Sequence, residues 1–182
     1  TSYTRASSIV PENQSTGVPA LLHAPTWNAP VKPLVNAACG EPSGALADIV
    51  ARYEVTGLVN NAGLNHLQKL GEIDLAAFDE VIAVNLRAAI QCAQAVLPTM
   101  RKARFGRIVN ITSRALLGRA NASSYAAAKA GLVALTRCWA LELADQNITV
   151  NAVGPGPTET DMWNKNNPPD SPSTRAHVAR IP

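Results

Sequence analysis

The sequence predicts an α/β fold built on a parallel sheet, and two observations lead to this prediction. Short apolar segments alternate with longer segments of helical period between residues 44 and 165. The longer segments can form the crossover helices that parallel strands require. Such crossovers are right-handed, and helices normally cover both faces of the resulting sheet. We therefore expect a sheet with helices on both of its faces.

The first elements follow a proline-rich beginning. A short helix is predicted over residues 45–53, and residues 57–59 form the centre of a buried strand. Asp74 is a suitable N-cap for a long helix ending near Met100, because its carboxylate can accept a hydrogen bond from a free backbone N–H. The apolar positions of this helix recur at helical spacing: Ala76, Phe78, Val81, Ile82, Leu86, Ile90 and Ala93.

The second half of the chain continues the alternation. Its predicted elements are a strand over residues 107–111, a helix from Ser123 or Ser124 to about Ala144, and a third strand over residues 148–153. After Met162 the chain becomes polar and proline-rich. The sequence contains no internal repeat.

Residues 1–43 have a different character. Six prolines interrupt this segment, and neither a period of two nor one of 3.6 is sustained in it. Repeated prolines prevent long helices and central strands. We therefore predict an irregular proline-rich leader over residues 1–43, a folded core over residues 44–165, and a short tail over residues 166–182.

Composition excludes several functional classes. The formal net charge is only +3 and the basic residues are scattered, so nucleic-acid binding has no support. No uninterrupted apolar run is long enough to cross a bilayer, and residues 1–10 lack the layout of a secretory signal. We therefore expect neither a nucleic acid nor a membrane as a partner.

The cysteines and histidines do not indicate a metal site. Three cysteines and three histidines lie far apart and lack the spacing of metal ligands: Cys39, Cys92, Cys138, His23, His66 and His177. An odd number of cysteines is most simply explained by reduced thiols in a cytoplasmic protein. We expect no metal and a cytoplasmic location.

Tyr125 and Lys129 are the most informative pair of residues. They are four positions apart in a helix-forming run, so they share one face of the predicted helix. A tyrosine titrates near pH ~10, and an adjacent cation lowers its pKa towards the range of general acid–base catalysis. The spacing alone is weak evidence, because any exposed helix face can carry it. A buried structural tyrosine and an exposed solubilising lysine are the alternatives.

Polar or turn-forming residues directly follow each predicted strand. Residues 60–63 (Asn-Asn-Ala-Gly) follow the first strand, Thr112 and Ser113 follow the second, and residues 154–158 (Gly-Pro-Gly-Pro-Thr) follow the third. Ligands bind outside the carboxyl ends of the strands in an open parallel sheet. Any one of these segments alone is more simply a turn. Three of them at equivalent positions, beside the Tyr/Lys pair, predict one shared site.

Together these residues resemble the short-chain dehydrogenase/reductase family. The similar motifs, in the family's order and near its spacing, are Asn60-Asn61-Ala62-Gly63, Asn85, the strand that leads from Gly106 to Ser113, Tyr125-Ala126-Ala127-Ala128-Lys129 and Pro155-Gly156. The resemblance covers about residues 45–165 and is greatest to reductases of the 3-oxoacyl-acyl-carrier-protein type. It implies a Rossmann-like, doubly wound parallel sheet, incomplete at both ends in this chain.

The resemblance implies catalytic roles for four residues. Tyr125 would exchange a proton with the substrate oxygen, and Lys129 would lower the tyrosine pKa. Ser113 would donate a hydrogen bond to the substrate carbonyl as negative charge develops on it. Asn85 would take part in a proton relay, and asparagine is unfavourable inside a helix unless it has a polar partner. The structural alternatives are a strand-end turn for Ser113 and a core amide for Asn85.

The resemblance also implies NADP or NAD as the cofactor, without a preference between the two. The implied cofactor-binding residues are Asn61, Ala62 and Gly63 at the adenine ribose, and Pro155, Gly156 and Thr158 at the nicotinamide, with Tyr125 and Lys129 at the nicotinamide ribose. The implied substrate is a small carbonyl compound or secondary alcohol. A homodimer or homotetramer is the implied assembly, with Trp139 and Leu143 as candidates for the subunit interface.

Two parts of the family's pattern are missing from this sequence: the glycine-rich turn near the beginning, and the final strand with the remainder of the substrate lid. The family begins with a glycine-rich turn that seats the pyrophosphate at a helix N-terminus. No Gly-x-x-x-Gly-x-Gly turn precedes Asn60. The sequence is therefore expected to be the catalytic middle of such an enzyme, and a non-catalytic remnant that keeps only the subunit-association helices is the alternative. A nucleotide-sugar epimerase uses the same Tyr/Lys pair, but the Asn-Asn-Ala-Gly and Pro155-Gly156 segments argue against it.

We predict weak dinucleotide binding by this chain. Without the glycine-rich turn, several hydrogen bonds to the phosphates and the field of a helix N-terminus are lost. Isothermal titration calorimetry with NADPH should therefore give a dissociation constant well above the micromolar range. Micromolar binding would contradict the prediction.

Overall fold

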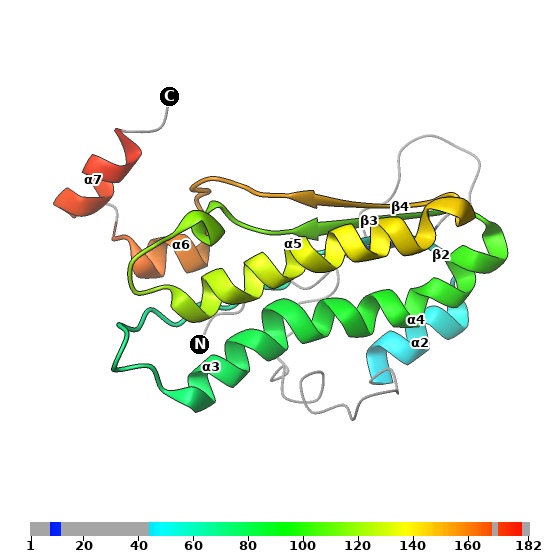
Figure 1. The fold of residues 1–182 in the computed structure, drawn as a ribbon, viewed down its shortest axis with the longest axis horizontal. Coiled ribbons are helices and arrows are strands. Elements are labelled where there is room, and N and C mark those ends of the chain that lie inside the picture. The colour runs from blue at the N-terminus through cyan, green and yellow to red at the C-terminus, as the bar shows by residue number, and fades with distance from the viewer. Residues whose placement is uncertain (1–7, 12–43, 169–170, 180–182) are drawn as a thin grey trace.

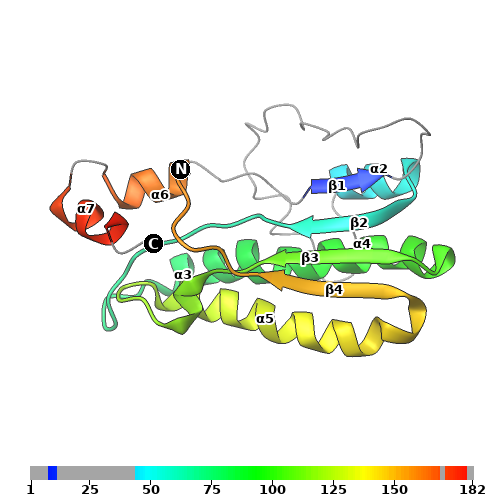
Figure 2. The ribbon, with the colours of Figure 1, turned by 90° about the horizontal axis from the view of Figure 1, so that it is seen from above.

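The computed structural model describes residues 8–11, 44–168 and 171–179. Four strands in these ranges form one sheet in the order β1-β2-β3-β4 (Figures 1 and 2). Strands β2, β3 and β4 are parallel, and β1 is antiparallel to β2. The predictions of an α/β fold and of a parallel sheet are confirmed. The strands are β1 (Ser8–Pro11), β2 (Val55–Asn60), β3 (Gly106–Ile111) and β4 (Ile148–Val153).

Strand β1 lies in the segment that we predicted to be irregular. It pairs with β2 from Ser8↔Val59 to Pro11↔Val55, with a shift of register before Pro11. The proline is tolerated because β1 is at the edge of the described sheet and Pro11 is its last residue. The remainder of residues 1–43 lies outside the described residues.

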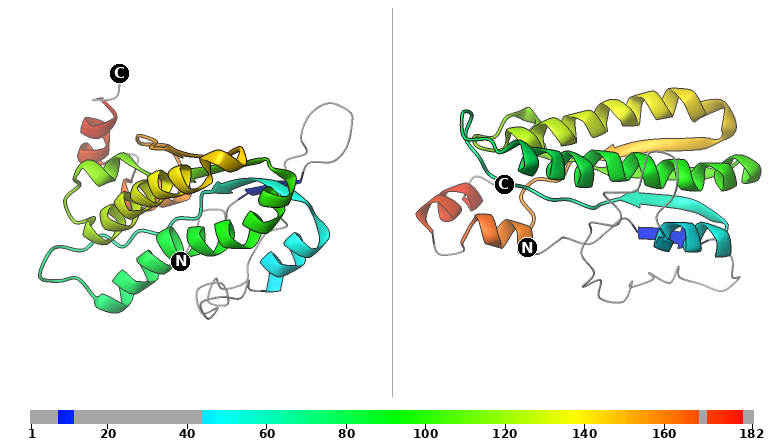
Figure 3. Two further views of the ribbon diagram at one scale, coloured as in Figure 1. Left: turned by 45° about the vertical axis from the view of Figure 1, so that its right-hand side comes forward. Right: turned by 90° about the horizontal axis from the view of Figure 1, so that it is seen from below.

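The helices that pack on the sheet all lie on one of its faces. They are α2 (Gly44–Arg52), α4 (Ala88–Ala103) and α5 (Ser123–Leu143), side by side in Figures 2 and 3. The chain advances in the same direction from β2 to β3 and from β3 to β4, so right-handed crossovers place α4 and α5 on the same face. We expected helices on both faces. In the described residues the other face has none, and Thr149 and Asn151 of β4 are exposed there.

The main apolar core lies between the sheet and these helices. Its buried residues are Val55, Leu58, Ala93, Val96, Met100, Ile108, Leu143, Ile148 and Val150. Only alternate residues of β3 are fully buried, because successive side chains of a strand point to opposite faces. Leu143 belongs to this core, so it is not available for the subunit interface that we expected. Trp139 packs against the same cluster while partly buried.

The long helix predicted from Asp74 is present, with a change of pitch in its middle. Asp74 is the N-cap of α3 (Leu75–Ile82) and accepts a hydrogen bond from the backbone N–H of Ala76 at 2.9 Å, as predicted. The π-helical turn η1 (Ala83–Arg87) joins α3 to α4, and Asn85 lies within it. A π turn adds one residue to a helical turn and often marks a functional site. The periodicity of the sequence does not reveal it.

The continuous helix from Leu75 to Ala103 meets the length and composition of a membrane span, which we did not expect from the sequence. These two criteria are weak evidence, because core helices of other proteins also satisfy them. In this chain Val96 and Met100 of the helix are fully buried against the sheet. These two apolar residues therefore belong to the core of the fold.

A chain of buried hydrogen bonds links two strands to α5. Asn60 Nδ2 donates to Asn110 Oδ1 at 2.8 Å, and Asn110 Nδ2 donates to Thr136 Oγ1 at 2.9 Å. The Thr136 hydroxyl in turn donates to the Leu132 carbonyl at 2.8 Å. Buried polar groups are costly unless they are paired, so these bonds favour one register of β2, β3 and α5.

Two short helices follow β4, and we did not predict them from the sequence. They are α6 (Asp161–Asn166) and α7 (Pro172–Val178), beyond the carboxyl ends of the strands (Figure 2). Thr160 caps α6 by accepting a hydrogen bond from the backbone N–H of Trp163 at 3.2 Å. The prolines and asparagines around these helices conceal their short helical period in the sequence.

Gly106→Ala should destabilise the fold. A Cβ at this position would lie 2.7 Å from Met100 Sδ and 3.0 Å from Ile148 Cγ2, inside the core. Overpacking of this kind typically costs about 1–3 kcal/mol. Urea unfolding should show a loss of this size, whereas Gly44→Ala, with no atom within 4 Å of the new Cβ, should show almost none. Equal stability of the two variants would contradict the tight packing at Gly106.

Candidate active site

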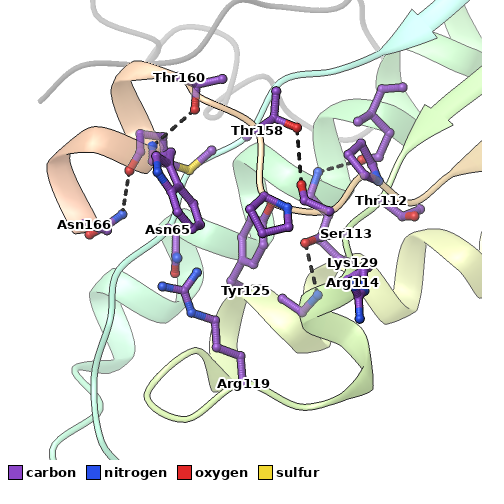
Figure 4. A pocket seen from close by; sticks show the side chains of 18 of the residues that line it. Asn65, Thr112, Ser113, Arg114, Arg119, Tyr125, Lys129, Thr158, Thr160 and Asn166 are labelled. Atoms are coloured by element: carbon purple, nitrogen blue, oxygen red, sulfur yellow. Dashed lines mark hydrogen bonds between the residues drawn. The ribbon is translucent and has the colours of Figure 1, made fainter. Parts of the chain in front are cut away.

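One cavity gathers most of the predicted site residues. It has a volume of about 710 Å³ and lies at the carboxyl ends of the strands, bordered also by α5 and α6 (Figure 4). Parallel strands end at the same edge of a sheet, which explains why the segments after β2, β3 and β4 meet there. The predicted residues that line the cavity are Asn61, Gly63, Ser113, Tyr125, Lys129, Pro155, Gly156 and Thr158.

Two predicted residues lie outside this lining. Ala62 packs against the apolar cluster that contains Val81, and Asn85 is buried behind Gly63. A Cβ added to Gly63 would lie 3.3 Å from Asn85 Oδ1 and 3.9 Å from Lys129 Nζ. The absence of a side chain at Gly63 therefore lets the loop after β2 pass close to both polar groups.

Lys129 is a buried residue of the cavity wall. It is 2% exposed, and its Nζ donates a hydrogen bond to the Ile111 carbonyl at 2.8 Å. The same Nζ lies 5.6 Å from the centroid of the Tyr125 ring, within the range of a cation–π interaction. Burial lowers the pKa of Lys129 to about 8, because desolvation disfavours the charged amine. The alternative of an exposed solubilising lysine is therefore wrong.

Tyr125 is partly buried in the same wall. Burial raises its pKa, and this effect outweighs the hydrogen bond with the Ser113 side chain and the charge of Arg119, which both lower the pKa. We predicted a pKa lowered by Lys129, and this prediction is wrong for the structure. Burial removes the solvation that a phenolate needs, and this is the largest of the influences on the pKa of Tyr125.

Ser113 connects β3 to the loop that follows it. Its Oγ accepts a hydrogen bond from the backbone N–H of Ala115 at 3.1 Å and so caps the short 3₁₀ helix η2 (Arg114–Leu117). A hydroxyl can accept and donate at the same time, so the proton of Ser113 can still bind an oxygen in the cavity. Ser113 is thus a strand-end residue, as in the alternative interpretation, and also a neighbour of the Tyr125 hydroxyl.

Asn85 ties the π turn to the loop after β2. Its Nδ2 donates to the carbonyls of Leu64 and Val81, each at 2.8 Å, and its Oδ1 accepts from the backbone N–H of Leu64 at 3.3 Å. These bonds satisfy an amide that is only 2% exposed. The alternative of a core amide therefore describes the side chain of Asn85, and its part in a proton relay stays a prediction.

The turn after β4 is fastened to the end of β3. The backbone N–H and the Oγ1 of Thr112 both donate to the Val153 carbonyl, at 2.7 and 3.0 Å. The backbone N–H of Arg114 donates to the Pro155 carbonyl at 3.2 Å. These bonds hold the turn that contains Pro155 beside the residues that follow β3.

Comparison with known proteins identifies the family. A family profile described as short chain dehydrogenase matches residues 41–171, which is more than half of the chain. The chain belongs to the short-chain dehydrogenase family. It is 43% identical over 136 residues to the (2S)-[(R)-hydroxy(phenyl)methyl]succinyl-CoA dehydrogenase subunit BbsD of Thauera aromatica, covering 67% of this chain and 55% of that protein. It is 43% identical over 119 residues to the 3-oxoacyl-[acyl-carrier-protein] reductase FabG of Thermotoga maritima, covering 64% of this chain and 48% of that protein.

Solved structures of short-chain dehydrogenases share the fold. An oxidoreductase of the family from Burkholderia thailandensis aligns with a TM-score of 0.64 at 32% identity, over 69% of this chain and 51% of that one. A protein from Beutenbergia cavernae aligns with a TM-score of 0.71 at 34% identity, over 76% of this chain and 55% of that one. It is described as a candidate NAD(P)-dependent gluconate 5-dehydrogenase, with NADP bound at low occupancy. These similarities confirm the Rossmann-like sheet. The chain spans about half the length of the curated relatives it matches.

The cavity has further lining residues that the sequence motifs did not indicate. They come from the loop between β3 and α5, from α6 and from the segment after β2: Asn65, Arg114, Ala115, Leu117, Arg119, Met162, Trp163, Asn166 and Asn167. None of them belongs to one of the recognised motifs at the ends of the strands. Only the folded chain brings them to the cavity, and the sequence contains no local signal that would have found them.

The described part of the chain offers no metal site. No group of three or more His, Cys, Asp or Glu side chains in it is placed to hold an ion. His66, which is among the described residues, pairs instead with Glu80, at 2.8 Å between His66 Nε2 and Glu80 Oε2. This pair joins the loop after β2 to α3.

The stability of the chain should rise with pH between about 8 and 10. The pKa of Lys129 is about 8 in the folded chain and 10.5 for a free lysine, so the unfolded chain binds more protons over this range. Lys129 should therefore add up to about 1.4 kcal/mol to the free energy of unfolding for each pH unit. The raised pKa of Tyr125 acts in the opposite sense only above pH ~10.

Urea unfolding of the wild-type chain and of Lys129→Met at several pH values between 8 and 10 measures how the free energy of unfolding changes with pH. The variant should lack the rise, because the group that loses its proton has been removed. Parallel pH profiles of the two proteins would show that the Lys129 amine is not desolvated.

Proposed function

We propose that the chain catalyses hydride transfer between a nicotinamide cofactor and a small carbonyl compound or secondary alcohol. The observation that supports this most directly is the meeting of Ser113, Tyr125 and Lys129 in one cavity. The Ser113 side chain is close enough to the Tyr125 hydroxyl to hydrogen-bond with it. Two hydroxyls that converge in this way are suited to bind the same substrate oxygen.

Tyr125 is the proposed proton donor and acceptor. With its raised pKa it is protonated at neutral pH, so it can give a proton to an oxygen that becomes an alkoxide. Ser113 would donate a second hydrogen bond to that oxygen and stabilise its developing charge. Lys129, with a pKa of about 8, is still mainly charged at neutral pH and can donate hydrogen bonds to a bound ribose.

The residues of the cavity fit the nicotinamide end of NADP or NAD. When bound, the nicotinamide supplies or accepts the hydride. Gly63 lies beside Lys129 in the cavity wall, since a Cβ at position 63 would be 3.9 Å from Lys129 Nζ. Lys129 would bind hydroxyls of the nicotinamide ribose, and Gly156 and Thr158 would flank the nicotinamide. Asn61 would lie at the adenine ribose. The NADP bound to the Beutenbergia cavernae protein supports the same cofactor class.

The names of the relatives support the proposed reaction class. They include a dehydrogenase of a hydroxy-substituted succinyl-CoA, 3-oxoacyl-[acyl-carrier-protein] reductases and a D-beta-hydroxybutyrate dehydrogenase. What these names share is the interconversion of a hydroxyl and a carbonyl group. We transfer only this shared chemistry to the chain.

We also propose that copies of the chain associate through the outer faces of α4 and α5, as a homodimer or homotetramer in the cytoplasm. Leu141 of α5 is a large apolar side chain that is 84% exposed and would be buried by such an association. Cys138 is an exposed free thiol, in keeping with a reducing compartment. The same exposed helix face supports the competing function, a non-catalytic subunit that only associates.

Tyr125→Phe should strongly reduce turnover and leave the fold intact. Ketone reduction, followed by the absorbance of NADPH or NADH at millimolar concentration, should slow about 10²–10⁴-fold because the general acid is lost. Ser113→Ala should slow the reaction about 10²–10³-fold, since one hydrogen bond to the developing oxyanion is removed.

Tyr53→Phe is the matched control, because Tyr53 is 45% exposed and does not line the cavity. This variant should retain full activity, and circular dichroism should give the same spectrum for all the proteins. Activity that survives Tyr125→Phe would exclude the proton-transfer role. Absence of turnover in the wild-type chain would instead support the non-catalytic subunit.

A further inference from the structure

The charged side chains that line the cavity are all positive. Within the described part of the chain they are Arg114, Arg119 and Lys129, and no aspartate or glutamate lines it. The nearest acidic residues along the chain, Glu159 and Asp161, are exposed and lie outside the lining. Among the described residues neither arginine forms an ion pair with a carboxylate. A cavity with this charge attracts anions.

The backbone holds Arg119 at a defined place on the cavity wall. Gly118 ends η2 with a φ of 113°, a conformation that favours glycine. The Arg119 carbonyl accepts a hydrogen bond from the backbone N–H of Ala122 at 3.2 Å. The Asn121 carbonyl accepts one from the backbone N–H of Gln68 at 2.7 Å. The loop that carries Arg119 is thus tied to the start of α5 and to the segment after β2.

The side chain of Arg119 extends towards the reacting hydroxyl. Figure 4 shows its guanidinium beside Asn65 and Tyr125, on the opposite side of Tyr125 from Thr158. The charge of Arg119 is one of the influences that lower the pKa of Tyr125, which agrees with this placement. Asn65 Oδ1 is buried and has no hydrogen-bond partner among the described residues. The Arg119 guanidinium and Asn65 Oδ1 therefore lie away from the turn after β4, which is proposed to hold the nicotinamide.

We propose that Arg119 is a specificity residue that binds a carboxylate on the substrate, whose hydroxyl or carbonyl group reacts at Tyr125. The inference rests on the proposed function, because it takes Tyr125 as the reacting site. A guanidinium binds a carboxylate through two parallel hydrogen bonds, which are stronger than bonds between neutral groups. A substrate held by its carboxylate at Arg119 and by its oxygen at Ser113 and Tyr125 has one orientation in the cavity.

Binding of a keto acid and of its neutral ester tests the inference. The probes are 4-oxopentanoate and methyl 4-oxopentanoate, which share a carbon skeleton and differ in charge. Dissociation constants from ligand-observed NMR, measured on the chain without nucleotide, should favour the acid. Arg119→Gln should weaken binding of the acid roughly tenfold to hundredfold and leave the ester unaffected, because only charge-assisted hydrogen bonds are lost.

Two further variants control the measurement. Arg119→Lys keeps the charge without the planar guanidinium, so it should retain part of the preference for the acid. Arg137→Gln removes an exposed arginine of α5 that does not line the cavity, so it should retain all of the preference. Circular dichroism should be the same for all three variants, because each replaced side chain is exposed.

Several results would overturn the inference. They are equal binding of acid and ester to the wild-type chain, no binding of either, a preference that survives Arg119→Gln, and an equal loss in Arg137→Gln. A further contradicting result is that Arg119→Gln weakens the binding of NADPH but not that of the acid. Arg119 would then bind a phosphate of the cofactor and not a carboxylate of the substrate. Failure of the proposed function gives a different result: the preference for the acid depends on Arg119, but no ketone is turned over.

Discussion

The hydrogen bond from Lys129 Nζ to the Ile111 carbonyl joins α5 to the end of β3 at 2.8 Å. Lys129 follows Tyr125 by one helical turn, and Ile111 precedes Ser113 by two residues. This one contact therefore fixes where the helix stands relative to the strand end, and with it the meeting of the two hydroxyls. It also gives a partner to an amine that is almost completely buried, and such a group is costly to leave unpaired.

Other buried polar contacts extend this constraint across the sheet. Asn85 binds the backbone of Leu64 and so holds the loop after β2 against the π turn. Asn110 connects Asn60 of β2 to Thr136 of α5. In a different packing each of these groups would lack its partner, at a cost of about 1–3 kcal/mol. Apolar contacts tolerate rearrangement more readily, so the polar contacts make the arrangement beneath the cavity specific.

Burial determines the electrostatics of the site more than the spacing of its residues does. It raises the pKa of Tyr125 and lowers that of Lys129, so both side chains are shifted towards their neutral forms. A protonated phenol suits donation of a proton to an alkoxide. The reverse reaction needs a phenolate, and the charge of Arg119 favours that form. The charge of Arg119 thus offsets part of the effect of burial on Tyr125.

The sequence by itself determined the alternation of strands and helices, the N-cap at Asp74, and the placement of Tyr125 and Lys129 at the carboxyl ends of the strands. These features depend on period, on capping and on position after a strand, all of which are local. Only the tertiary structure decided the π turn at Asn85, the helices on one face, the raised pKa of Tyr125 and the presence of Arg119 in the cavity. Each of these depends on burial or on contact between segments far apart in the chain, which periodicity and spacing do not encode.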